Sequence, residues 1–550
     1  MSSTRPQFYA NTLPPAEINK ASLESTLQEL QLAIKNGVDI IRNFSQRPTD
    51  ASSHGNIYSG ISGIVFALLR LERQKASILE NELDSSDHRF GELALDLIPP
   101  APTEVTLVDG RNSPIASALG PVFTRILAVC EDQNLRLGRR LSIIQEDAAT
   151  FNQAIETSTQ HGNVISFNGH KVGGDEIFFG RAGLLWAILT IERHCYEEQT
   201  AKAVKPLLAP AFQAMPRLVD AIISAGKQSA QDFEIQHGKK APLPLMWPWL
   251  GEHYALGAVH GISGILTMLL SCDLSLLRVG ETNDYLTLIA DTVNGLCQIC
   301  IENNGHFPMS IPPLPSSEQR SSPLLQLCHG APGIVILLGA VYQNKFFLDS
   351  FWKPEWQIAL RLSTERIWEE GLLSKGGNLC HGLTGNIWPL LPFHRIYEYN
   401  SNFQMQGEQL RLAELKKTEG KATTIEDTKE LFSSDFFLSR VLPFMLLARE
   451  TPPYSEVIGI KPSFDFRAPD RPYSLGEGLA GKLCAWAETC TVIKARLEKM
   501  KLQESGNDIS DLEQDENYQK YLSQHLGLPL FEVNGPTTYA FQLCLDRATH

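Results

Sequence analysis

The stretch Leu379-Cys380-His381-Gly382-Leu383-Thr384-Gly385-Asn386 decides the fold of this chain of 550 residues. A near copy stands earlier in the sequence, at Leu327-Cys328-His329-Gly330-Ala331-Pro332-Gly333. Each places a cysteine and a histidine directly before Gly-x-x-Gly and an apolar run. Two such elements in one chain are not expected by chance. We predict that the rest of the chain is a scaffold that brings the two elements together.

Gly-x-x-Gly followed by an apolar run recurs along the whole chain. The units, one of them degenerate, are spaced by 52 to 96 residues and begin at Gly60, Ser117, Gly180, Gly261, Gly330, Gly382 and Gly478. Each apolar run predicts a buried helix, and the amphipathic stretches at 24–42, 204–225 and 358–370 predict outer helices. The pattern favours a closed ring of helical hairpins. We expect one domain over residues 1–550, with polar insertions near 81–90, 400–430 and 500–520.

Composition excludes several classes of protein. The chain is 43% hydrophobic and 20% charged, which is typical of a soluble globular protein. Its net charge of −14 argues against a nucleic-acid partner. The sequence has neither an apolar signal-peptide core nor a run of about 18 apolar residues. Because its ten cysteines are dispersed over a long chain, we expect a reducing, cytoplasmic location and no transmembrane segment.

The paired Cys-His elements predict a metal site. Cys328, Cys380 and His381 supply two thiolates and an imidazole, which can hold zinc and leave its fourth position open, as in catalytic zinc sites. Each cysteine precedes a predicted helix, whose N-terminus favours the thiolate over the thiol. The alternative is that both cysteines are small buried hydrophobic residues.

Further ionisable residues stand at the other helix starts. His260 precedes an apolar helix in the same register as His329 and His381 but follows no cysteine. We expect it to protonate or orient a reacting group across a central cavity, and the alternative is an ordinary core histidine. Asp175 and Glu176 precede Gly180. Either acid can orient an imidazole, but acids are equally expected at a helix start because of the helix dipole.

Two short motifs imitate functional sites. Cys297 and Cys300 have metal-site spacing but lie in an apolar helical run without a second pair, so core packing is expected. Gly476 to Lys482 imitates a phosphate-binding loop. Leu483 stands where that loop needs Ser or Thr for magnesium, and no predicted strand precedes it.

The motifs together resemble the lanthionine synthetase C-like family, in its eukaryotic branch, over nearly the whole chain. Five segments carry the resemblance. They are Phe-Gly-Arg-Ala-Gly from Phe179, Gly-Ala-Val-His-Gly-Ile-Ser-Gly from Gly257, Leu-Cys-His-Gly-Ala-Pro-Gly from Leu327, Leu-Cys-His-Gly-Leu-Thr-Gly-Asn from Leu379, and Pro-Tyr-Ser-Leu-Gly-Glu-Gly-Leu-Ala-Gly from Pro472. The resemblance implies an all-α fold, an α/α toroid of seven inner and seven outer helices.

The resemblance also implies site residues. Zinc would be held by Cys328, Cys380 and His381, and the catalytic histidine would be His260. Eukaryotic members of the family bind glutathione and add its thiol to dehydroalanine or dehydrobutyrine residues in proteins. Their glutathione-contacting positions correspond to Lys375, Arg467, Asp470 and Arg5.

From these residues we expect a zinc-dependent glutathione transferase. Lys375, Arg467 and Arg471 would hold the glutathione carboxylates, and His260 or His329 would protonate the product enolate. Asp175 or Glu176 would orient that histidine. Two alternatives remain open: a lanthionine-type cyclase that acts on a peptide, and a non-catalytic scaffold that binds zinc and glutathione. Leu327 stands where the family has an aromatic residue, and Leu324 stands where bacterial cyclases have an arginine. These departures weigh more against the cyclase than against the zinc site.

Overall fold

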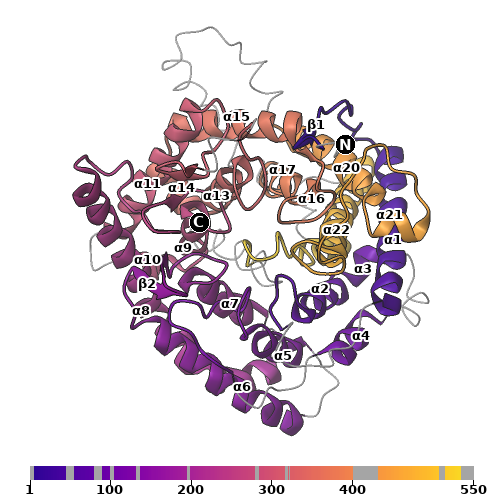
Figure 1. The fold of residues 1–550 in the computed structure, drawn as a ribbon. Helices are drawn as coiled ribbons and strands as arrows, with labels where there is room; N and C mark the ends of the chain where they lie inside the picture. Colours follow the sequence, from indigo (N-terminus) through magenta and orange to yellow (C-terminus); the bar gives the residue numbers. More distant parts are fainter. Residues whose placement is uncertain are drawn as a thin grey trace.

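The structure is a computed structural model, and it describes residues 5–44, 55–79, 89–98, 105–131, 137–194, 198–278, 284–315, 320, 322–399, 432–506 and 515–533. Its helices form two concentric layers around a central axis (Figure 1). The inner helices all begin at or within a Gly-x-x-Gly unit. They are α2 (Ile61–Arg73), α5 (Gly120–Glu131), α7 (Arg181–His194), α9 (Ile262–Leu270), α13 (Ala331–Gln343), α16 (Leu383–Ile387) with α17 (Leu390–Tyr399), and α22 (Leu479–Glu504).

The outer layer packs against these inner helices. It consists of α1 (Lys20–Phe44), α4 (Phe90–Leu97), α6 (Leu137–Ser158), α8 (Glu198–His237), α11 (Asp284–Glu302), α15 (Pro354–Glu370) and α20 (Ser434–Leu447). The first and last units close the ring, because α22 packs against both α1 and α2. The predicted α/α toroid of seven inner and seven outer helices is therefore confirmed in the part of the chain that the structure describes.

The sixth inner helix differs from the single run that we expected. It is divided into α16 and α17, which are separated by Trp388 and Pro389. Proline has no backbone N–H and interrupts the helical hydrogen bonds. The inner layer is otherwise apolar nearly all round: every residue of α9 from Ile262 to Leu270 is buried.

Backbone hydrogen bonds join the loops that precede the inner helices. Cys328 N donates to Cys380 O (3.2 Å), Cys380 N to Gly476 O (2.9 Å), and Gly476 N to Tyr58 O (2.8 Å). The series continues from Tyr58 N to Ile115 O (2.8 Å), and Ser113 N donates to Phe179 O (2.8 Å). Residues far apart in sequence are thus held side by side at one end of the inner layer.

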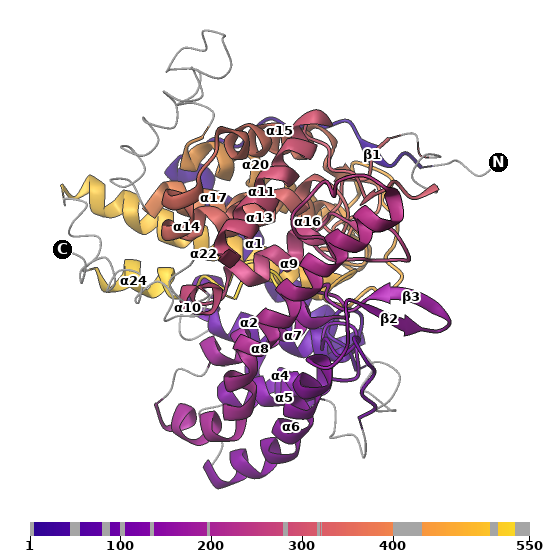
Figure 2. The same ribbon diagram turned by 90° about the vertical axis from the view of Figure 1, so that its left-hand side faces the viewer.

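The strands are short. β1 (Phe8–Tyr9) pairs antiparallel with β6 (Leu372–Leu373), and β4 (Tyr254–Ala255) pairs with β5 (Ser310–Ile311). The hairpin of β2 (Val164–Phe167) and β3 (His170–Gly173) projects from the ring (Figure 2). The β1–β6 pair places the N-terminal segment next to the loop that carries Cys380.

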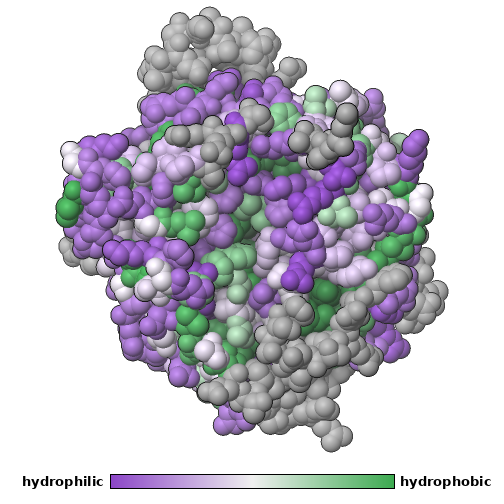
Figure 3. All heavy atoms as spheres, viewed as in Figure 1, coloured by the Kyte–Doolittle hydropathy of each residue, from purple (hydrophilic) through white to green (hydrophobic). Residues whose placement is uncertain are grey.

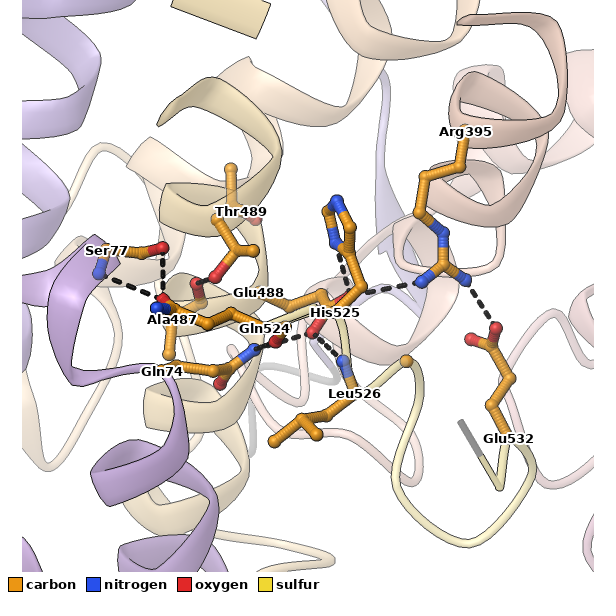
Figure 4. A network of polar contacts seen from close by, with 12 residues as sticks. Gln74, Ser77, Arg395, Ala487, Glu488, Thr489, Gln524, His525, Leu526 and Glu532 are labelled. Atoms are coloured by element: carbon orange, nitrogen blue, oxygen red, sulfur yellow. Dashed lines mark hydrogen bonds and ion pairs between the residues drawn. The ribbon is translucent and has the colours of Figure 1, made fainter. Parts of the chain in front are cut away.

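The segment 524–533 enters the ring and is held by a buried polar network (Figure 4). Glu488 of α22 accepts hydrogen bonds from Gln74 (2.7 Å), from Leu526 N (3.1 Å) and from Nδ1 of His525 (3.2 Å). Arg395 of α17 bridges Glu488 (3.3 Å) and Glu532 (2.5 Å). The C-terminal part of the described chain therefore connects inner helices that come from both ends of the sequence.

The expected insertions lie mostly outside the described residues, which is the case for 400–430 and nearly all of 81–90. Around 500–520 the described parts are helical: α22 runs to Glu504, and α24 (Glu516–Leu522) packs Tyr518 and Leu522 against Ala495. Seen from the side of Figure 1, the surface is mostly hydrophilic, with hydrophobic residues showing near its middle (Figure 3).

Among the described helices, none is by itself both long and apolar enough to span a membrane. One bent pair, α13 with α14 (Lys345–Phe351), satisfies the length and composition criteria jointly, with an angle of 100° between its two helices.

Candidate metal centre

The structure brings together the three residues that we expected to bind a metal. The ligand atoms of Cys328, Cys380 and His381 all lie within 4.8 Å of one another. Both cysteines are buried and His381 is half-buried. The two Cys-His elements, distant in sequence, thus form one cluster at the start of α13 and α16.

The turn before α16 allows the neighbouring residues Cys380 and His381 both to face the cluster. Asn378 is buried, accepts a hydrogen bond from His381 N (2.9 Å), and donates to Lys375 O (3.1 Å). A Cβ atom on Gly382 would lie 2.4 Å from Asn378 N, so this turn requires glycine. Sequence reasoning did not single out Asn378, although an asparagine that ends a Gly-Gly pair is a turn signal.

The pKa values of the two sulfurs shift in opposite directions. Hydrogen bonding by Cys328 lowers the pKa of Cys380 well below its usual range, against the effect of burial, and His381 acts in the same direction. The pKa of Cys328 is raised, by its hydrogen bond to Cys380 and by burial. A buried pair of sulfurs beside an imidazole is the donor set that zinc prefers, so these residues fit that ion.

His260 and Glu176 form a second pair beside the cluster. Nδ1 of His260 lies 3.1 Å from Oε2 of Glu176. Glu176 also accepts from the backbone N–H groups of Phe178 (2.9 Å) and Phe179 (2.9 Å), which fixes its carboxylate. With Nδ1 of His260 facing the acid, Nε2 is the nitrogen left to face a reacting group.

The adjacent acid has a different partner. Asp175 forms an ion pair with Arg181 (2.6 Å), and both side chains are almost fully buried. Burial raises the pKa of Asp175 to about 6, although Arg181 acts against this shift. Of the two acids that we considered for orienting a histidine, Glu176 is the one that contacts His260, and Asp175 serves the ion pair.

His329 lies between His260 and the metal cluster. Its ring stacks on that of His260, with centroids 5.5 Å apart, and Trp249 packs against both imidazoles. Burial, together with the charge of His260, lowers the pKa of His329 to about 3. Nδ1 of His329 is buried and has no hydrogen-bond partner among the described residues.

The residues expected to hold glutathione gather around the loop after β6. Arg467 N donates to Ser374 O (2.8 Å) and Ser374 N donates to Gln7 O (3.2 Å), which brings Lys375, Arg467 and the N-terminal segment together. Arg5 pairs with Asp465 (2.7 Å) and Arg467 with Asp470 (2.7 Å), all on exposed side chains.

Two members of this set carry no such ion pair. Lys375 and Arg471 are exposed, and within the described residues neither has an acidic partner at ion-pair distance. Lys375 also acts electrostatically on Cys328 and His329, so its charge lies near the metal cluster.

Residues that sequence reasoning missed complete the surroundings. The Tyr58 hydroxyl donates to Glu477 (3.1 Å). Arg111 lies between the rings of Phe167 (4.1 Å) and Phe179 (3.5 Å). An apolar cavity adjoins Cys380, and its lining includes Tyr58, Phe178, Leu327, Leu379, Leu530 and Phe531. Only the Gly-x-x-Gly that follows Tyr58 marks this region in the sequence.

The two motifs that imitate functional sites, Cys297 with Cys300 and the segment from Gly476 to Lys482, have structural roles, as expected. Cys297 and Cys300 are fully buried in α11, where Sγ of Cys300 lies 3.1 Å from the Ser363 hydroxyl. The Lys482 ammonium is also buried, and it donates to the backbone oxygens of Thr451 (3.0 Å) and Pro452 (3.1 Å).

Comparison with known proteins gives a consistent result. The sequence model of the family described as "Lanthionine synthetase C-like protein" matches residues 135–418, which is just over half of the chain. "Glutathione S-transferase LANCL1" of Danio rerio is 26% identical over 377 residues, which are 68% of this chain and 76% of that protein. "LanC-like protein GCL1" of Arabidopsis thaliana is 24% identical over 488 residues, 88% of this chain and 89% of that protein.

A solved structure also aligns with this one. "Nisin cyclase" is 13% identical, with a TM-score of 0.40, and the alignment covers 76% of this chain and 98% of that chain.

Proposed function

The chain belongs to the lanthionine synthetase C-like family, and from that premise we propose that it adds the thiol of glutathione to dehydroalanine or dehydrobutyrine residues of proteins. In this proposal zinc is the cofactor, held by Cys328, Cys380 and His381. One observation carries the proposal: these three ligands converge, and His260, which contacts Glu176, stacks on His329, the residue that directly follows Cys328. Ligands for a thiol-binding metal and a candidate proton donor thus share one site.

The proposed reaction is a conjugate addition. When bound, zinc would lower the pKa of a thiol that occupies its open coordination position. The new C–S bond forms at the β-carbon, the π electrons of the C=C bond move toward the carbonyl oxygen, and a proton is delivered to the α-carbon. No oxidant or reductant is needed, because the thiol loses one proton and the α-carbon gains one.

His260 is the residue that we assign to proton delivery. Glu176 holds Nδ1, so the imidazole is fixed in the tautomer and orientation that leave Nε2 toward the reacting atoms. His329 stacks on His260 and has no fixing partner for Nδ1 among the described residues. We therefore favour His260 over His329.

Lys375, Arg5, Arg467 and Arg471 are proposed to hold the carboxylates of glutathione, since guanidinium and ammonium groups bind carboxylates strongly. Lys375 and Arg471 can bind without giving up an ion pair. Arg5 and Arg467 are already held by Asp465 and Asp470, which position their guanidinium groups. Asp470 thus has a positioning role in this proposal. The relative from Danio rerio, which is named a glutathione S-transferase, supports glutathione as the thiol.

The test is intact-mass analysis of a dehydroalanine peptide after incubation with the protein, glutathione and zinc. We expect a gain of one glutathione per dehydroalanine, lost in Cys380→Ala and His260→Ala and retained in Cys300→Ala, whose cysteine lies in the core. A zinc-loaded protein that binds glutathione but leaves the peptide unmodified would be a scaffold. Ring closure in a peptide that carries its own cysteine, without addition of glutathione, would indicate a cyclase.

A further inference from the structure

A half-buried arginine stands between two aromatic rings close to the His260–Glu176 pair. The guanidinium carbon of Arg111, in the loop before α5, lies 3.5 Å from the ring centroid of Phe179 and 4.1 Å from that of Phe167. The two rings come from different segments, the loop before α7 and strand β2. Since all three residues are half-buried and none is fully buried, a ligand can reach the guanidinium.

The stacked guanidinium keeps its hydrogen-bonding edge available. Aromatic rings cover the two faces of an arginine, but the N–H groups lie in its plane and remain free to donate. Within the described residues, no ion pair or side-chain hydrogen bond involves Arg111. Glu176 acts on its charge only electrostatically, because that carboxylate contacts His260 and accepts from two backbone N–H groups. The arginine is thus fixed in position with its donors unused.

Phe179 connects this arginine to the candidate proton donor. The backbone N–H of Phe179 donates to Oε1 of Glu176 (2.9 Å), and Oε2 of the same carboxylate lies 3.1 Å from Nδ1 of His260. The ring of the adjacent Phe178 packs edge-on against His260, with centroids 5.2 Å apart. An anion held by Arg111 would therefore belong to a molecule that also lies close to His260.

The cations that we propose for glutathione stand at other places around the ring. Lys375 precedes the sixth inner helix, and Arg467 and Arg471 precede the seventh, whereas Arg111 precedes the second. Strand β1 and the β2–β3 hairpin lie at the same end of the molecule (Figure 2), so both groups of cations border the end that carries the metal cluster. The reactant left for Arg111 is the acceptor protein.

We propose that Arg111, held between Phe167 and Phe179, binds a side-chain carboxylate of the acceptor, so that the protein selects dehydroamino acids with an aspartate or glutamate nearby in the acceptor chain. This inference rests on the proposed function, because it concerns the acceptor of that reaction. One guanidinium group matches one carboxylate through two parallel hydrogen bonds. A phosphate dianion suits the place less well, because the negative charge of Glu176 acts on the same position.

The test measures how labelled peptides bind to the full-length protein, by fluorescence anisotropy and without glutathione, so that no transfer occurs. Each peptide carries one dehydroalanine and one aspartate, placed at different distances on either side, and each has a counterpart with asparagine instead of aspartate. We expect at least one aspartate peptide to bind about 10-fold more tightly than its counterpart, which is the usual gain from hydrogen bonds to a charged group.

Two variants of Arg111 identify the residue responsible. Arg111→Gln should abolish the preference for aspartate, and Arg111→Lys should keep only part of it, because lysine retains the charge but lacks the planar fork. Affinity for the asparagine peptides should stay near wild type in both, whereas a purely structural role would weaken both kinds of peptide equally. Arg217→Gln is the matched control, since this exposed arginine of the outer helix α8 pairs with Glu156 (3.0 Å).

The outcomes separate this inference from the proposed function. Equal binding of every aspartate and asparagine pair by the wild-type protein would overturn the inference, and so would a preference that survives in Arg111→Gln. A phosphoserine peptide that binds more tightly than its aspartate equivalent, and loses this advantage in Arg111→Gln, would overturn the assignment to a carboxylate. A preference that depends on Arg111 in a protein that transfers no glutathione would leave the inference standing and reject the proposed function.

Discussion

Two neighbouring carboxylates, Asp175 and Glu176, have different partners in this molecule. Glu176 lies next to Nδ1 of His260, and Asp175 is buried against Arg181. The sequence did not separate them, because either acid is acceptable before a helix start. The turn from Gly174 to Gly180 separates them, since it directs Glu176 toward His260 and Asp175 toward Arg181.

Glu176→Gln should lower the turnover number for glutathione transfer while the Michaelis constant and the zinc content stay near wild type. The single amide oxygen can accept from only one of the Phe178 and Phe179 N–H groups, and the neutral side chain no longer stabilises a charged His260. We expect a loss of about 10–100-fold, part of what general acid–base catalysis contributes. Steady-state kinetics and metal analysis test this. Unchanged turnover would exclude a positioning role for Glu176.

Asp175→Asn supplies the contrast. It leaves the Arg181 cation buried without its anion, and breaking a buried ion pair costs about 3 kcal/mol or more. We expect a lower free energy of unfolding in urea. Any protein that folds should transfer glutathione at a nearly normal rate. A variant with full stability and reduced turnover would show that the two acids had been assigned the wrong way round.

At the scale of the element, five of the Gly-x-x-Gly units share one geometric cause, whereas Gly333 instead faces the backbone of Gly257 and Ala258. In these five units a Cβ atom on the second glycine would collide with the carbonyl oxygen six residues earlier. The distances are 1.9 Å for Gly63, 2.0 Å for Gly183, 1.8 Å for Gly264, 1.6 Å for Gly385 and 2.2 Å for Gly481. The chain therefore turns sharply into each inner helix and passes over its first turn. The structure thus identifies the atom that each of these five glycines approaches.

Gly385→Ala should destabilise the protein strongly, because backbone atoms of Leu379 cannot move without displacing the adjacent Cys380. Overpacking typically costs about 1–3 kcal/mol, and a backbone collision at 1.6 Å belongs at the upper end. Zinc content should fall together with stability. Chemical denaturation and metal analysis of the purified variant provide the measurement.

Gly162→Ala is the matched control, since a Cβ atom there would meet nothing within 4 Å. It should unfold at the wild-type denaturant concentration. Equal stability of the two alanine variants would contradict the steric account of the repeat.

At the scale of the whole molecule, the segment 524–533 closes the interior of the ring. Leu528, Leu530 and Phe531 are buried and line the apolar cavity beside Cys380. The backbone of the same segment accepts hydrogen bonds from Arg70 of α2 and from Arg193 of α7, at Val533 O (3.0 Å). Its position links the stability of the ring to the shape of the candidate site.

Phe531→Ala should remove about 3–5 kcal/mol of stability, the usual cost of truncating a buried aromatic residue. It should also enlarge the cavity next to Cys380. Urea unfolding gives the first quantity, and a gain in binding of small apolar ligands such as xenon reports the second. A wild-type unfolding curve would mean that this segment does not stay in the ring in solution.

Acid should weaken the ring through Glu398 of α17. Burial by itself raises the pKa of this carboxyl, but the charges of His394, Arg496 and Lys499 outweigh burial and lower it to about 2. Oε1 of Glu398 lies 2.5 Å from Arg496 and 2.9 Å from Lys499, both on α22. Because the folded pKa is below the unfolded value of 4.5, the stabilisation is complete above about pH 4.5 and is lost as the pH falls toward 2.

At neutral pH this stabilisation comes from Arg496 and Lys499, because burial lowers the pKa of His394 to about 4. Urea unfolding at a series of pH values from 7 to 3 measures it. Glu398→Gln should be less stable at pH 7 and should lose less stability between pH 5 and pH 3 than the wild type. Parallel pH profiles for the two proteins would exclude this carboxyl as a source of the acid sensitivity.

The sequence by itself determined the ring, the order of its units, and the three residues that gather at the candidate metal centre. It did so because a buried helix needs an apolar run, and because the same backbone turn requires glycine at the same place in five of the units. Cys328, Cys380 and His381 were predictable since each stands at a fixed register before such a turn.

Only the tertiary structure decided which groups meet across the ring. Tyr58, Glu477 and the 524–533 segment come from opposite ends of the chain, and their contacts depend on how the first and last helices close. The partners of Asp175 and Glu176 were likewise settled by the path of one turn. The periodicity of apolar residues indicates which residues face inward. Hydrogen bonds and ion pairs, however, depend on separations of a few ångströms between segments, and the sequence does not place those segments relative to each other.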